Sequence, residues 1–441
     1  MMNMKNGISL RKIVFTTALF LSFFYSNAQL QCDNDTTGLK SLIDLKTGLY
    51  LGYQGGLYPY GSNSMPYPHF SSGMNVSKQV LPLDSNGMVD LLDGKVGFIC
   101  LGASTAGNAF NHFKSVAEND PTVNPCLRFV NAAVGAKGLE IMTDTIVNDW
   151  YWDDDVMDDV YDANITRYQV QVVWIMVTSR DDSILLWPMQ PRVVADKYEL
   201  LMPILIAKFP NLKEVFVSGF NYGGYADPTK EFYEMIYEPS SYWNNWSVKW
   251  LIERQINADP DLKFTTPGRR SPWIGWGPHL WADGLRANFA DGLRWNCLVD
   301  FKPDGGGYHL SNTGKDKEGE LIYDFFKNST VAADWFRYGA RWTSCDPDLR
   351  MSEINSSGNA ETLIFPNPSN GTSYLEIKNI GSNSIEIFIY NAVGQLVYYS
   401  REQSFGDYHI AELKLTGASP GLYNCKIKAG DQQIDLSFVI Q

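Results

Sequence analysis

The segment 170–177, VQVVWIMV, restricts the possible folds of this chain more than any other feature. It is apolar at nearly every position, with Gln171 as the exception. A strand with one wet face alternates apolar and polar residues, whereas a strand covered on both faces is apolar almost throughout. The segment therefore predicts an inner strand of a parallel sheet with helices on both faces.

Other segments repeat this pattern and alternate with amphipathic stretches, which is typical of an α/β domain with a mostly parallel sheet. Helices are predicted where apolar residues recur at helical spacing, as with Leu200, Leu201, Ile204 and Leu205. The predicted strands are 96–102, 126–134, 170–177, 214–220 and 273–277, and the predicted helices are 197–209, 246–256 and 315–326.

Composition agrees with a globular protein. Hydrophobic residues make up 44% of the 441 residues and charged residues 19%, which excludes a disordered chain. The formal net charge of −13 argues against a nucleic-acid partner, because such proteins usually present a basic face.

The first 28 residues are typical of a secretory signal peptide. Lys5, Arg11 and Lys12 precede an apolar run at 13–24, and small residues lead up to Ala28. The run is short for a membrane span, although a lone membrane anchor is the alternative interpretation. Cleavage after Ala28 would export a chain that begins at Gln29.

Composition divides the exported chain into three parts. Residues 29–345 form the predicted α/β domain. Residues 346–361 are polar and rich in Ser and Asn, which indicates a linker. Residues 362–441 hold short alternating segments separated by Gly, Asn and Pro, which predict a small all-β sandwich.

Export exposes the six cysteines to an oxidising compartment, where disulfides form. Their spacing contains no CxxC pair, so a zinc site is not expected. Cys100 lies within a predicted strand and is expected to be a buried free thiol. A disulfide between Cys32 and Cys345 would close the α/β domain, but the sequence leaves the pairing open.

Ligands of an open α/β sheet bind beyond the carboxyl ends of its strands, so the residues that follow each strand are the site candidates. Ser104 follows the first strand, where a nucleophile or a simple N-cap would lie. Gly135 follows the second strand and is either an approach point for a ligand or a turn glycine. His309 lies in a Gly-rich loop downstream of Asp304 and Asp300, which suits a base with a supporting acid or a loop histidine.

Two further features have a plain and a functional interpretation. The acidic run at 148–162 lacks the spacing of a calcium loop, so a solvated face is favoured. Tryptophan clusters at 241–250 and 271–284 could stack on sugars, but most are expected in the core.

Three sequence blocks, GASTAGNAF, FVNAAVG and DGGGYHLSNTG, resemble those of the SGNH (GDSL-type) hydrolase superfamily. The resemblance spans about residues 95–330. It implies a three-layer α/β/α sandwich, with Ser104 as nucleophile and His309 as base. The backbone N–H groups of Ser104 and Gly135 would stabilise the oxyanion.

The chain departs from that family at three places. Ala103 replaces the usual Asp beside the nucleophile, which is not a catalytic position. After the third strand, Thr178 and Ser179 stand where the family has an oxyanion-binding Asn, so Ser179 becomes the candidate donor. Gly306 stands where the supporting Asp is usual, and Asp304 becomes the candidate, with Asp300 as the fallback.

The C-terminal segments IFPNPSNG, YNAVGQLVYYS and PGLYNCKIKAG resemble the C-terminal sorting domain of type IX secretion substrates. This resemblance implies that residues 362–441 bind the type IX secretion machinery of a Bacteroidetes-type bacterium. The protein would cross the periplasm and outer membrane, and then be released or kept at the surface. An adhesion-type sandwich is the alternative.

Together these features predict a secreted esterase or deacetylase that acts on acylated carbohydrate and needs no metal or organic cofactor. Ser104, His309 and Asp304 would be catalytic, and Ser104, Gly135 and Ser179 would form the oxyanion hole. The alternatives are a non-catalytic glycan-binding protein and a structural surface protein with the same fold.

Overall fold

A computed structural model describes residues 30–337 and 361–440, apart from short gaps at 91–92, 182, 184, 231–232, 304, 366, 368, 370, 379–383, 404–407, 416 and 431. The predicted signal peptide (1–28) and the predicted linker up to residue 360 lie outside the described residues. None of the helices in the described part of the chain is long and apolar enough to cross a membrane.

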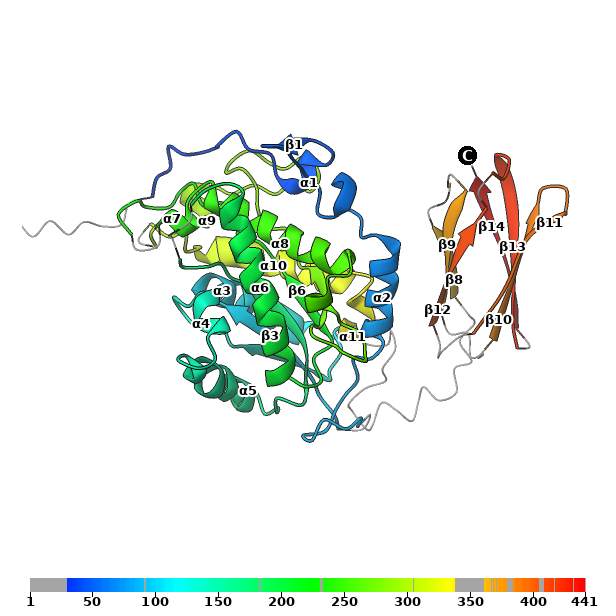
Figure 1. Ribbon diagram of the computed structural model, residues 1–441, viewed down its shortest axis with the longest axis horizontal. Coiled ribbons are helices and arrows are strands. Elements are labelled where there is room, and N and C mark those ends of the chain that lie inside the picture. The colour runs from blue at the N-terminus through cyan, green and yellow to red at the C-terminus, as the bar shows by residue number, and fades with distance from the viewer. Residues whose placement is uncertain are drawn as a thin grey trace, which may run out of the picture.

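The first part of the chain contains the predicted parallel sheet (Figure 1). Its five strands lie in the order β4-β3-β5-β6-β7 and all pairs are parallel. Each predicted strand is present, although β4 and β6 are several residues shorter than predicted because their ends turn into loops. The strands are β3 (Val96–Gly102), β4 (Leu127–Asn131), β5 (Val170–Met176), β6 (Glu214–Val217) and β7 (Trp273–Trp276).

Helices cover both faces of this sheet. Alternate side chains of β5 separate into two cores: Val173 and Ile175 join one, and Val172 and Trp174 join the other. Helices α6 (Met189–Lys208) and α8 (Ser240–Ile256) pack on the first core. Helices α3 (Ser104–Asn119) and α10 (Asn312–Asn328) pack on the second core. Full burial of β3 and β5 explains their almost unbroken apolar sequence.

The three predicted helices exist but begin earlier than predicted. Helix α6 begins at Met189 rather than residue 197, and Pro191 lies in its first turn, where proline is tolerated. Helix α8 begins at Ser240 rather than residue 246, and its first turn is polar yet buried. Burial of Ser240 and Ser241 overrides the sequence pattern at the start of α8.

A disulfide joins Cys32 to Cys297, not to Cys345, which lies outside the described residues, and Cys126 is disulfide-bonded as well. The Cys32–Cys297 disulfide ties the start of the described chain to α9 (Cys297–Asp300), and residues 31–37 form hydrogen bonds with the loops around Tyr225 and Asp283. Cys100 is a buried free thiol, as predicted.

The C-terminal part is all-β, as predicted. Two antiparallel sheets, β11-β10-β13-β14 and β12-β9-β8, enclose a single aliphatic core. The strands, orange to red in Figure 1, are β8 (Glu361–Phe365), β9 (Thr372–Lys378), β10 (Ser384–Asn391), β11 (Leu396–Gln403), β12 (Tyr408–Lys414), β13 (Gly421–Ala429) and β14 (Gln432–Ile440).

The remaining elements are short and connect the main layers. They are α1 (Leu42–Leu45), β1 (Leu49–Tyr50), β2 (Tyr53–Gln54), η1 (Pro59–Gly61), α2 (Tyr67–Ser77), α4 (Leu139–Thr143), η2 (Tyr151–Val156), α5 (Met157–Asp162), α7 (Tyr233–Ile236), η3 (Pro260–Leu262) and α11 (Ala333–Phe336).

Candidate active site

Ser104 is the first residue of α3, directly beyond the end of β3. The turn into the helix needs Gly102, which has φ +153°, because a Cβ atom there would lie 2.4 Å from the carbonyl oxygen of Met176. The first N–H groups of a helix have no partner within it, so the N–H of Ser104 points outward at the positive end of α3. The turn thus presents both a hydroxyl group and a backbone donor.

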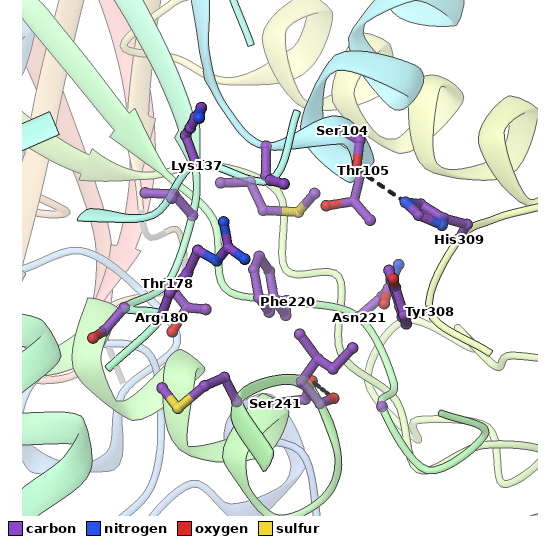
Figure 2. A pocket seen from close by; sticks show the side chains of 18 of the residues that line it. Ser104, Thr105, Lys137, Thr178, Arg180, Phe220, Asn221, Ser241, Tyr308 and His309 are labelled. Carbon is purple, nitrogen blue, oxygen red and sulfur yellow. Dashed lines mark hydrogen bonds between the residues drawn. The ribbon is translucent and has the colours of Figure 1, made fainter. Parts of the chain in front are cut away.

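His309 lies near the C-terminal end of the α/β part of the sequence, and the fold brings it against Ser104. It lies in the loop before α10, and its Nε2 atom is 3.0 Å from Ser104 Oγ (Figure 2). A separation of 205 residues along the chain therefore closes to a hydrogen bond. This is the contact that a base needs in order to take the proton of a nucleophilic hydroxyl group.

The surroundings of His309 favour the neutral imidazole. Burial lowers its pKa, a hydrogen bond with the Gly305 backbone raises it, and the charges of Lys302 and Lys315 lower it further. The net shift of the pKa is downward. A neutral ring can accept a proton at Nε2, whereas a charged one cannot.

The acid predicted to support His309 is only partly accounted for. Asp304 lies outside the described residues. Asp300, the fallback, is buried and its carboxylate accepts the N–H of Asn296 and an ion pair from Lys317. No hydrogen bond joins Asp300 to His309 in the part of the chain that the structure describes. Asp300 therefore serves the packing of α9 against α10.

Gly135 lies in the turn that follows β4, between Val134 and Lys137. A Cβ atom at Gly135 would meet open space, so no close contact demands glycine there. The next residue, Ala136, has φ +58° and lines the cavity beside Ser104. A non-glycine residue in this region of φ is uncommon and marks a backbone held by its surroundings.

Ser179 also lines the cavity, but its hydroxyl group is already engaged. It donates to Glu140, whose carboxylate also accepts from Lys197 and from the backbone N–H of Arg180. The hydroxyl group of Ser179 thus belongs to a partly buried ion-pair network. Because the hydroxyl group already donates its hydrogen bond to Glu140, it has no second proton to donate to an oxyanion.

A cavity of about 150 Å³ opens beside Ser104 and His309. Figure 2 shows Asn221 and Tyr308 next to His309, with Thr178 and Arg180 on the opposite side. Much of the remaining wall is apolar, with Met176, Val177, Phe220, Met235 and Ile236. The cavity therefore has a polar end near His309 and apolar sides.

The sequence analysis did not identify two polar residues at this end. Asn221 lines the cavity, and its Nδ2 atom donates a 2.8 Å hydrogen bond to Glu318 of α10. Asn221 directly follows the predicted strand 214–220, so the rule that selected Ser104 should also have selected it. Glu318 lies in a polar stretch that resembles an exposed helix face, and nothing in the sequence marks its burial.

The other candidate features prove to be structural. Trp246, Trp273 and Trp281 are fully buried, so they form core rather than sugar platforms. The acidic run forms η2 and α5, with Asp153 to Asp155 exposed. No cluster of three or more His, Cys, Asp or Glu side chains suited to a metal ion occurs among the described residues.

Residues 363–441 match the family described as "Secretion system C-terminal sorting domain". This chain is exported by the type IX secretion system. Its destination is the cell surface or the extracellular space, and the sorting domain implies contact with the secretion machinery. A Bacteroidetes-type source agrees with this match. The match is confined to the sandwich and does not reach Ser104 or His309.

No curated protein matches the chain. Among solved structures, a SusE-like protein (BT2857) is 16% identical over 18% of this chain and 28% of its own, with a TM-score of 0.15. The Ig1 domain of mouse SynCAM 2 is 15% identical over 18% and 92%, with a TM-score of 0.14. An FMN-binding β-glucuronidase from Facaelibacterium prausnitzii L2-6 is 11% identical over 88% and 55%, with a TM-score of 0.23. Scores this low establish no shared fold.

Proposed function

We propose that this exported protein is a serine hydrolase of the SGNH type that cleaves esters, with Ser104 as nucleophile and His309 as base. The observation that carries this proposal is the 3.0 Å contact between Ser104 Oγ and His309 Nε2 at the rim of a cavity. A serine that only caps a helix needs no histidine on its hydroxyl group. The strand order β4-β3-β5-β6-β7 supports the proposal, since it is the doubly wound order in which ligands bind at the carboxyl edge.

The proposed reaction has two halves. Ser104 Oγ attacks the ester carbonyl carbon while His309 Nε2 takes its proton, and the carbonyl oxygen becomes an oxyanion. The intermediate collapses, the C–O bond to the alcohol breaks, and His309 returns the proton to the leaving oxygen. Water then attacks the acyl-serine with the same base, which releases the acid and restores Ser104.

Backbone donors would stabilise the oxyanion. The N–H of Ser104 at the start of α3 is one, and the turn at Gly135 and Ala136, of which Ala136 lines the same cavity, offers a second. We exclude Ser179 from this role because its hydroxyl group donates its hydrogen bond to Glu140. Secretion favours an acylated carbohydrate as the substrate, since such polymers lie outside the cell.

Hydrolysis of 4-nitrophenyl acetate by the mature chain tests this proposal. Ser104→Ala and His309→Ala should each lower turnover by about 10³-fold or more, because the nucleophile and its base act as one unit. Ser115→Ala is the matched control, since Ser115 lies on the same helix and is exposed. A fluorophosphonate should label the wild type and Ser115→Ala, but not Ser104→Ala. A folded wild type that neither turns over nor takes the label would refute the proposal.

A glycan-binding protein without catalysis is the second candidate. The engaged hydroxyl group of Ser179 favours it, because fewer oxyanion donors than usual would remain. Losing one such donor costs about 10²- to 10³-fold in turnover. Retention of acylated glycans by a wild type that fluorophosphonate fails to label would select this candidate.

A further inference from the structure

Glu318 is a buried carboxyl group, and a contribution to the stability of the fold does not explain its position. It has no exposed surface, and its Oε1 atom has no hydrogen-bond partner among the described residues. No ion pair to Glu318 occurs within the described residues. Burial raises its pKa to about 7, and the bond from Asn221 opposes that shift. A buried carboxyl group with an unmet oxygen destabilises a fold, and such groups are enriched at functional sites.

The single partner of Glu318 in the described structure is Asn221 at the cavity wall. Asn221 Nδ2 donates to Glu318 Oε2 at 2.8 Å. A carboxyl group has an accepting oxygen in both its ionised and its protonated form, so this bond holds the amide nitrogen of Asn221 toward α10. The second N–H and the oxygen Oδ1 of Asn221 then remain for the cavity side. Glu318 thus sets the orientation of a donor–acceptor pair.

The backbone on both sides of Asn221 is also held in place. The N–H of Phe220 donates to Asn244, and its carbonyl oxygen accepts from Asn245, both on α8. The N–H of Gly223 donates to buried Glu238. A Cβ atom at Gly223 would lie 1.9 Å from the carbonyl oxygen of Ile236, so the loop lies directly against α7. Asn221 is therefore presented by a rigid loop.

The position of Asn221 relates it to one part of the substrate. Among the residues that line the cavity, Figure 2 shows Asn221 and Tyr308 on the side of His309, opposite Arg180 and Thr178. In the proposed reaction His309 delivers its proton to the leaving alcohol, so groups beside His309 face that alcohol. This step of the argument rests on the proposed function.

We propose that Asn221 binds a hydroxyl group next to the esterified oxygen of the leaving alcohol, and that Glu318 is the residue that positions it. A hydroxyl group both donates and accepts, which matches the oxygen and the free N–H of a fixed amide. The substrates would therefore be esters of polyols, of which sugars are one class. A site built to bind a hydroxyl group discriminates strongly against an analogue that lacks it, because its own polar groups lose their partners.

A matched pair of esters tests the selectivity. 2-Hydroxyethyl acetate and propyl acetate have nearly the same shape and differ by one hydroxyl group. Wild type should prefer the first by about tenfold or more in kcat/KM. Asn221→Leu should bring this ratio close to one. Glu318→Leu should do the same, mainly through KM, and Glu318→Gln should keep part of the ratio because its amide oxygen still accepts from Asn221.

Controls separate selectivity from folding and from chemistry. Two variants should leave the ratio at the wild-type value. Glu320→Gln changes an exposed side chain two residues further along α10, and Asn75→Ala changes an exposed side chain on α2. Circular dichroism checks that each variant folds. A wild-type ratio near one would overturn the inference. So would an equal loss for both esters in Asn221→Leu, which would indicate a role in the chemical step.

A binding measurement keeps the inference testable if neither ester turns over, the result that would defeat the proposed function instead. Saturation-transfer NMR on Ser104→Ala should detect 2-hydroxyethyl acetate above propyl acetate. Adding Asn221→Leu should remove that difference. Equal signals from the two esters in Ser104→Ala would refute the role of Asn221.

Discussion

The α/β part and the sandwich bury their strands in different ways. Strands β3 and β5 are buried at every position, whereas β10 alternates between buried and partly exposed residues. The α/β part also buries carboxyl groups completely, among them Glu214 and Glu318, whereas the sandwich buries fewer polar groups among its described residues and leaves its buried carboxyl group, Glu376, 7% exposed. The α/β part therefore accepts more unfavourable groups than the sandwich does. This difference is expected if one part performs chemistry and the other is recognised as a surface.

Removing the Cys32–Cys297 disulfide should give the largest difference in stability between the α/β part and the sandwich. Cys32 and Cys297 are separated by 265 residues, and closing so long a loop stabilises a fold by about 4–5 kcal/mol. The variant with both cysteines changed to serine should lower the unfolding free energy of the α/β part by that amount in urea. The sandwich, which holds the free thiol Cys425, should unfold at an unchanged midpoint. An equal shift of both transitions would mean that the two parts unfold as one.

Core truncation in each part gives a smaller, reciprocal test. Ile387 and Ile175 are both fully buried, one in β10 and one in β5. Ile→Ala at either position should cost about 2–5 kcal/mol in the part that contains it. Ile387→Ala should lower the amount secreted without changing turnover per folded molecule, whereas Ile175→Ala should lower turnover. A loss of turnover in purified, folded Ile387→Ala would contradict the division of labour.

Glu318 allows a test of the buried carboxyl groups themselves. Its pKa is about 7 in the fold, above its ordinary value of 4.5, so its contribution to stability is complete below pH 4.5 and is lost as the pH rises through 7. A shift of this size corresponds to about 3 kcal/mol between pH 4 and 8. Because Gln does not titrate, the unfolding free energy of Glu318→Gln should rise by that amount relative to wild type over this range. Glu320→Gln should show no such trend, and a constant difference between Glu318→Gln and wild type would mean that Glu318 is not desolvated.

The sequence predicted the parts of this fold that depend on local pattern. Runs such as 170–177 identify inner strands because burial on both faces leaves no room for polar residues. The starts of α6 and α8 were predicted too late, at α8 because Ser240 and Ser241 are polar yet buried, and at α6 because Pro191 interrupts the helical pattern. The partner of Cys32 was equally unpredictable, because pairing depends on three-dimensional proximity and not on spacing.

The candidate site divides in the same manner. Ser104 could be selected because it follows a predicted strand, and His309 because it lies in a Gly-rich loop before the last predicted helix. The engagement of Ser179 by Glu140 and Lys197 could not be foreseen, as it joins three segments. The burial of Glu318 was not predicted because α10 carries charged residues on several sides, and only the packed structure shows that the side chain of Glu318 faces inward.

The smallest of the predicted effects is the pH dependence of turnover, which tests the proposed chemistry of the α/β part. Burial and the charges of Lys302 and Lys315 lower the pKa of His309. Since the base acts only when neutral, kcat/KM should fall as acid is added, with a midpoint below the ordinary histidine value of about 6.5. Lys302→Gln and Lys315→Gln each remove a charge that depresses the pKa, so both should move this midpoint upward. A midpoint above 6.5 in wild type would indicate that a negative charge supports His309, and Asp304 would then be the first residue to replace.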